Sequence, residues 1–209
     1  MSAAKIARAS QTIVRHRRDG EGFLVPVQKR ALADTLGQTQ VELSIDLNNA
    51  PVPQRRYHAK VAQVVANGDS ISLLFGQLRV GQGRRLRSLI DVSMTPDAVR
   101  QFMSTCVQFH PLMHDFLQKN GIERTSLAEI DEEPEHTVSM VVNLVAAAMS
   151  GREAVMDMYH MSAFSLREVR DTDQIGVDPV VRIDLSTALL AGLLDRLGEL
   201  AHTFPGETR

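Results

Sequence analysis

The dipeptide Asn67-Gly68 constrains the fold of this chain more than any other feature of its sequence. Asn-Gly between two apolar runs is typical of a two-residue β-turn, because such a turn needs positive φ at both central residues. From Ser70 onward, apolar and small residues alternate in the order SISLLFGQ, which is the period of a strand with one buried face. The sequence therefore predicts an antiparallel hairpin around residue 67.

A third strand and a long helix follow this hairpin. Residues 90–94 alternate again as IDVSM, and Thr95-Pro96 then supplies an N-cap and a residue suited to the first helical position. An apolar stripe at helical spacing continues to Asn120-Gly121. We expect a helix over 96–119 that is kinked or interrupted at Pro111. The residues expected to share one core are Phe75, Val92, Phe102, Met103 and Phe109.

A weaker version of the same order occupies residues 136–201. Val138–Val145 is an apolar run, Ser150-Gly151 is a turn signal, and Ala154–Leu166 is expected to be a strand. A further alternating strand around Ile183 leads to Ser186, which is suited to cap a helix over 187–201. An offset of 91 residues, the difference between 186 and 95, aligns the two expected caps. The order of strands and helix thus repeats.

These patterns predict an α+β protein with a mainly antiparallel sheet, built from two similar strand-hairpin-strand-helix units. The first unit spans 23–121 and the second spans 136–201, each ending in its helix. Residues 122–135 form an acidic linker between them, and 202–209 form a short tail. The basic stretch 1–22 is expected to be a solvated N-terminal arm.

The start of the first unit has three further expected elements. Phe23–Val27 is expected to be a brief strand, and Lys29–Leu36 a short helix ended by Gly37. Val41–Leu47 alternates apolar with polar residues, which predicts a half-buried strand.

Composition restricts the class of protein. Apolar residues make up 44% and charged residues 23% of the 209 residues, with a net charge of −2, so the chain is ordinary for a soluble globular protein and not globally basic. One cysteine excludes an internal disulfide framework. The sequence has neither a bilayer-spanning apolar stretch nor a signal peptide at its start, which predicts a cytoplasmic protein with no membrane contact.

The motifs of the first unit carry a family resemblance. Ala66-Asn67, the run Leu74-Phe75-Gly76-Gln77 and the run from Val92 to Ala98 resemble a small bacterial family of uncharacterised proteins over about Val61–Gly121. In that family two strands end in Phe-Gly-Gln and a third precedes a Ser-Pro-x-x-Ala helix. Thr95 stands here for the serine, and the alanine comes one position early. The resemblance supports the expected fold, but it implies no reaction, because the family has no established activity. Strands followed by a long helix also look like the SecB-type export chaperones, as an analogy of architecture.

The sequence contains no recognisable catalytic arrangement. It lacks a Gly-x-Ser-x-Gly elbow and a Gly-x-x-x-x-Gly-Lys-Ser/Thr phosphate loop. His110 and His114 have a spacing that can hold a metal, but Pro111 follows directly and no glutamate stands at the expected position. We therefore expect no enzyme, no metal and no cofactor. The glycine-rich turn 76–83 is the nearest candidate for anion contact, and its arginines are Arg79, Arg84, Arg85 and Arg87.

Methionine suggests a binding surface in the second unit. The chain has nine methionines and no tryptophan, and surfaces that accept varied partners often use methionine, although it also fills cores. The candidate interface residues are Met156, Met158, Tyr159 and Met161. The strands of this unit also carry few charges, so its sheet edge is the least protected. We expect a homo-oligomer, most simply a two-fold dimer, in which the second unit contributes more of the interface.

Two functions remain open on the sequence alone. The first is a non-enzymatic binding or assembly protein that presents sheet edges and apolar faces to itself or to another polypeptide in a chaperone-like manner. The second is a nucleic-acid-associated accessory protein that uses arginines on one face. These arginines are Arg15, Arg17, Arg18, Arg55, Arg56, Arg84, Arg85 and Arg87.

Overall fold

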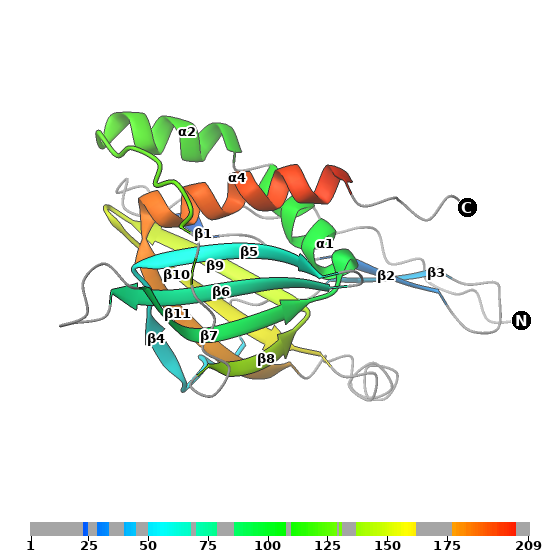
Figure 1. The fold of residues 1–209 in the computed structure, drawn as a ribbon. Helices are drawn as coiled ribbons and strands as arrows, with labels where there is room; N and C mark the ends of the chain where they lie inside the picture. The colour runs from blue at the N-terminus through cyan, green and yellow to red at the C-terminus, as the bar shows by residue number, and fades with distance from the viewer. Residues whose placement is uncertain are drawn as a thin grey trace, which may run out of the picture.

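A computed structural model gives the arrangement of the helices and strands (Figure 1). It describes residues 23–24, 29–33, 40–44, 50–67, 70–78, 86–107, 110–128, 130, 137–161 and 177–203. The expected basic arm at 1–22 lies outside these residues, as do the whole acidic stretch 131–135 and the end of the chain after 203.

The described strands form two main sheets and one separate hairpin. The first sheet has the order β5-β6-β7-β8, with β5 at Val61–Asn67, β6 at Ser70–Leu78, β7 at Leu86–Met94 and β8 at Val138–Val142. The second has the order β1-β9-β10-β11-β4. Its strands are β1 at Phe23–Leu24, β9 at Leu144–Ser150, β10 at Glu153–His160, β11 at Asp178–Ser186 and β4 at Arg56–His58. Most pairs are antiparallel, so the predicted α+β class is confirmed.

The separate hairpin corrects one expectation. Lys29–Ala33 is the strand β2, paired with β3 at Gln40–Ser44, and not the start of a short helix. Alanine and leucine have high helix propensity, but intrinsic propensity amounts to less than about 1 kcal/mol per residue, so pairing with a neighbouring strand can override it.

Three described helices follow the strands: α1 at Pro96–Val107, α2 at His110–Lys119 and α4 at Thr187–Thr203. The helix expected over 96–119 is therefore two helices, and Pro111 lies in the first turn of α2, where its missing N–H has no intrahelical partner to lose. The helix α4 packs against β5, β10 and β11, so it contacts both main sheets, while α1 packs against α4, β6 and β9. The helices cover the upper side of the two sheets in Figure 1.

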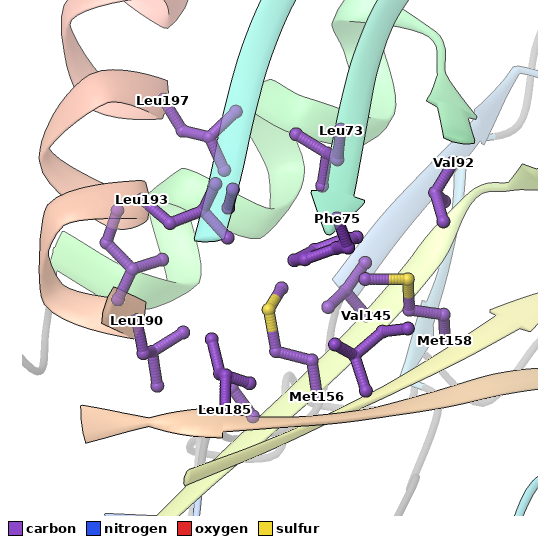
Figure 2. Packing of buried hydrophobic residues seen from close by; sticks show 14 of the residues in the cluster. Leu73, Phe75, Val92, Val145, Met156, Met158, Leu185, Leu190, Leu193 and Leu197 are labelled. Carbon is purple, nitrogen blue, oxygen red and sulfur yellow. The ribbon is translucent and has the colours of Figure 1, made fainter. Parts of the chain in front are cut away.

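The core lies between the two sheets and beneath α1 and α4. Phe75, Val92 and Phe102 are fully buried in it, and Met103 packs against it from a partly buried position. Phe109, the fifth residue expected there, lies outside the described residues. Figure 2 shows Phe75 of β6 near Met156 of β10, with leucines of α4 to their left. One cluster thus joins both sheets and both helices.

The two hairpins have the same pairing register. Val61 pairs with Gly76 in the first hairpin, and Leu144 pairs with Tyr159 in the second. Both positions differ by 83 residues (144 − 61 and 159 − 76). The strands β5 and β9 therefore correspond along their whole lengths.

The bulges and the helix caps also correspond. The register shifts after Phe75 between β6 and β7 and after Met158 between β10 and β11, again 83 residues apart (158 − 75). Thr95 Oγ1 and Ser186 Oγ each accept a hydrogen bond from the backbone N–H three residues later, at 3.2 and 3.1 Å. These capping residues are 91 apart, so the chain inserts eight more residues before β11 than before β7. The expectation that α1 and α4 cross their sheets in the same sense remains a prediction.

The sheets do not follow the expected division into two units. The strand β4 precedes β5 but pairs in parallel with β11, and β8 precedes β9 but pairs in parallel with β7. The chain changes sheets at two corresponding points. At these points the N–H groups of Lys60 and Asn143 donate to the carbonyls of Gly76 and Tyr159, at 2.9 and 3.1 Å. The strands that directly precede the two hairpins, β4 and β8, therefore each lie in the sheet that contains the other hairpin.

Candidate functional site

The strand β8 is the terminal strand of its sheet and exposes apolar side chains. Val141 is 62% exposed and Val138 is 40% exposed, whereas Met140 and Val142 face inward and are buried. The alternation places Ser139 and Val141 on the outer face. The side of β8 that is turned away from β7 has no strand partner within the described residues. We call this strand with its unpaired side the β8 edge.

Neighbouring residues hold both ends of the β8 edge. Thr137, which directly precedes it, lies with its hydroxyl 2.5 Å from the hydroxyl of the buried Ser88 on β7. Asn143, which directly follows it, donates from Nδ2 to the carbonyl of Met161 at 2.9 Å and accepts from the N–H of Met161 at 2.8 Å. The backbone of the edge is therefore fixed before anything binds.

The β8 edge carries no ionisable side chain. All eight residues of 137–144, in the order TVSMVVNL, are apolar or neutral. Natural proteins protect terminal strands with charges, prolines or a covering segment, because unpaired backbone groups otherwise recruit another strand. No such charge or proline is present in this strand.

The corresponding strand β4 is protected in this way. Arg56 donates from Nη2 to Asp184 at 2.9 Å and makes a second bond from Nε to the same carboxylate. Nδ1 of His58 also lies 3.3 Å from Asp184. The 83-residue offset between the two hairpins makes Arg56 and His58 of β4 equivalent to Ser139 and Val141 of β8.

The terminal strand β5 is covered in a different way. Gln63 accepts a hydrogen bond at Oε1 from the N–H of Ile130 at 2.8 Å, and Ile130 is buried. The segment that contains Ile130 therefore lies against β5. Among the terminal strands with described side chains, β8 alone has no charged residue and no covering segment within the part of the chain that the structure describes.

The four residues expected at an interface are not on the surface. Met156 and Met158 are fully buried in the core between the sheets, and Tyr159 and Met161 are buried in a smaller cluster with Leu144. This corrects the predicted interface. The strand β10 was expected to need covers on both faces, and both covers come from the same chain: the other sheet on one face and residues near Ala50 and Val177 on the other.

Paired charges occupy the outer face of the second sheet beside that smaller cluster. Arg182 donates to both carboxylate oxygens of Asp157, at 2.6 and 2.5 Å, and this bond raises the pKa of Arg182. The hydrogen bond to Asp184 likewise raises the pKa of Arg56. These two ion pairs stabilise the charged guanidinium groups of Arg182 and Arg56, so neither of these two cations is free for a ligand.

Burial raises the pKa of Tyr159, and the nearby Asp157 carboxylate raises it further. The pKa of Tyr159 is therefore higher in the folded state than in the unfolded state, where it is about 10. The stability that this difference contributes is fully present below the unfolded-state pKa and is lost as pH rises through the folded-state pKa. We expect ultraviolet absorbance to show phenolate formation by Tyr159 only above its ordinary range. The Tyr159→Phe variant, which keeps Tyr57 alone, identifies the step. A Tyr159 step at or below pH of about 10 would contradict this.

The arginines expected to contact an anion are mostly not described. Arg79, Arg84 and Arg85 lie outside the described residues, and Arg87 is exposed on β7. Of the wider set expected to contact nucleic acid, 15, 17 and 18 are also outside the described residues. Arg55 is exposed, whereas Arg56 is bound to Asp184. The predicted convergence of these arginines on one face stays a prediction.

A shallow cleft of about 520 Å³ lies between β5, α4 and the segment after α2. Its charged groups pair with each other: Arg124 with Asp195 at 3.2 Å, and Arg196 with Glu199 at 2.7 Å. Backbone of the neighbouring segment comes so close to Gly192 that a Cβ there would lie 2.1 Å from the carbonyl oxygen of Thr125. The cleft therefore joins α4 to the preceding segment and presents no uncompensated charge.

The described residues offer neither a metal-binding group nor a membrane-spanning helix. They contain no group of three or more histidine, cysteine, aspartate or glutamate side chains arranged to hold a metal ion. His114 is exposed on α2, and the side chain of His110 is not described. No described helix is both long and apolar enough to cross a membrane.

The chain matches no protein-family model, no curated protein and no solved structure. The resemblance to a small bacterial family and the architectural likeness to SecB-type chaperones therefore remain expectations.

The β8 edge is a site that sequence reasoning found only in part. The low charge of Val138–Val145 indicated an unprotected edge in this region. The exposed valines Val138 and Val141 were not singled out, because periodicity alone cannot tell a terminal strand from a central one.

Proposed function

We propose that this protein is a non-enzymatic binding and assembly protein, and that its binding surface is the β8 edge. The observation that carries the proposal is a terminal strand with no partner on one side among the described residues, two exposed valines and no charged side chain. An extended polypeptide strand can add to such an edge through main-chain hydrogen bonds, with side-chain contacts supplying the specificity.

The form of the β8 edge supports strand addition over other modes of binding. Its backbone is already extended and is held at Thr137 and Asn143, so little conformational entropy is lost when a partner binds. The exposed Val141 offers apolar area on the outer face, and the exposed Val138 offers it at the start of the strand. A partner strand that covers both would remove this area from water.

The described ion pairs favour this function over nucleic-acid binding. Binding to nucleic acid depends on cations that are available to phosphates. Arg56, Arg124 and Arg196 are each within ion-pair distance of a carboxylate of the same chain. The binding of nucleic acid is therefore the second candidate.

The decisive variant is Val141→Lys, which adds a charge to the β8 edge without touching the core. We expect association of the purified protein, or capture of a polypeptide partner, to weaken by roughly tenfold or more, because a strand that pairs here must desolvate the ammonium group or face a like charge. Light scattering and quantitative co-purification measure the two forms of association.

The matched control is Val52→Lys. Val52 is also a half-exposed valine, at 50%, but it lies in the loop before β4. It should leave association and folding unchanged. Equal association of wild type and Val141→Lys, with both folded by circular dichroism, would overturn the proposal.

A further inference from the structure

We infer that the β8 edge binds a second copy of this chain, in an antiparallel two-fold arrangement centred on Met140. This inference rests on the proposed function and names the partner of the same site. It turns the two four-stranded sheets of the two copies into one continuous sheet across the β8–β8 pair.

Charge is the first reason to choose a second copy. In a two-fold antiparallel pair each residue lies opposite itself or opposite a residue of the same strand, so a strand with charges of one sign would place like charges together. The β8 edge has no charge from Thr137 to Leu144 and so meets the condition for pairing with itself. Its counterpart β4, with Arg55, Arg56 and His58 at the corresponding positions, does not.

Repetition of contacts is the second reason. The edge is only five residues long, and a single short peptide could form few main-chain hydrogen bonds with it. A second copy brings folded surface beside its strand that a peptide lacks, and the two-fold axis repeats each contact which that surface makes. It also brings the exposed Val138 and Val141 of both copies into one interface.

The pattern of buried and exposed side chains sets the register. Opposed residues of an antiparallel pair point to the same face, so inward residues must lie opposite inward residues. Centring on Met140 satisfies this rule and pairs all five residues, with Val138 opposite Val142 and Ser139 opposite Val141. A register centred nearer the C-terminal end of β8 would include Asn143 in the strand pair. The side chain of Asn143 is already hydrogen-bonded to Met161.

Disulfide trapping tests this register. On a Cys106→Ala background, which removes the single native cysteine, Ser139→Cys and Val141→Cys are made as separate full-length variants. Directly opposed residues have Cβ atoms about 4.5–5.5 Å apart and diagonal ones about 7–8 Å apart. A disulfide needs Cβ atoms at roughly 3.5–4.5 Å, so only opposed residues come close enough after a small adjustment.

We expect mild oxidation of the mixed variants to give a cross-linked dimer joining one Ser139→Cys chain to one Val141→Cys chain. Each variant alone should remain uncrosslinked, and tryptic mass mapping identifies the bond. Efficient cross-linking of either variant alone would overturn the Met140-centred register.

The Val141→Lys variant separates this inference from the proposed function. If the wild-type chain is monomeric at micromolar concentration but loses a co-purifying polypeptide on Val141→Lys, the second-copy partner is wrong and the binding edge stands. If the wild type is a dimer that Val141→Lys dissociates, both stand. If neither association changes, both are wrong.

Discussion

Replacing Phe102 by alanine is expected to lower the free energy of unfolding by about 3–5 kcal/mol. Phe102 is fully buried on α1 in the cluster that joins both sheets. Truncation removes its contacts and leaves a cavity that the rigid sheets on one side can fill only in part. Chemical denaturation, with the midpoint and the slope fitted separately, measures the change.

Two variants on the same helix control this measurement. Phe102→Leu keeps most of the volume and should cost roughly 1.5 kcal/mol or less. Ser104→Ala alters an exposed side chain whose hydroxyl bonds only to the carbonyl of Gln101 within the helix, and should stay within about 0.5 kcal/mol of wild type. A nearly neutral Phe102→Ala would mean that this face of α1 packs on something other than the core.

Local signals predicted the elements of the fold well. The Asn67-Gly68 turn, the cap at Thr95 and the cap at Ser186 are each set by a few adjacent residues. The structure has β6, α1 and α4 beginning at or next to the expected positions. The 91-residue offset between the caps was also visible, because capping chemistry repeats even where identity does not.

The pairing of β4 with β11 and of β8 with β7, each in the sheet of the other hairpin, could not be predicted from the sequence. The run Val138–Val145 was expected to be one apolar segment, with Ser139 and Asn143 as its polar residues. The structure divides it at Asn143 into β8 of one sheet and β9 of the other. This division depends on bonds from Asn143 to Met161 and Tyr159, and pairing between distant segments leaves no local periodicity to read.

The methionines show why the candidate site was misplaced. Alternating Met156 and Met158 on a strand with apolar groups on both sides predicts two covers; the other sheet covers one face, and a smaller cluster of the same chain covers Tyr159 at the end of the other. Composition cannot say whether a cover comes from the same chain or from a partner. The sheet order settles the question, because β10 lies between β9 and β11 and faces the other sheet.

Replacing Met156 by aspartate is expected to abolish the folded state at neutral pH. The change removes methionine packing worth about 2–5 kcal/mol and places a carboxylate, with no cation near it in an apolar cluster, at a further cost of several kcal/mol. Together these losses approach the whole stability of a typical domain, about 5–15 kcal/mol. Far-ultraviolet circular dichroism and thermal melting measure the outcome.

Val141→Asp is the matched control, because it adds the same charge to an exposed position in the second half of the chain. It should fold like the wild type and should lose only the association that the β8 edge supports. If Met156→Asp instead gave a folded monomer with an unchanged melting temperature, Met156 would have to reach solvent. The placement of Met156 in the core between the two sheets would then be wrong, and the binding surface would have to include β10.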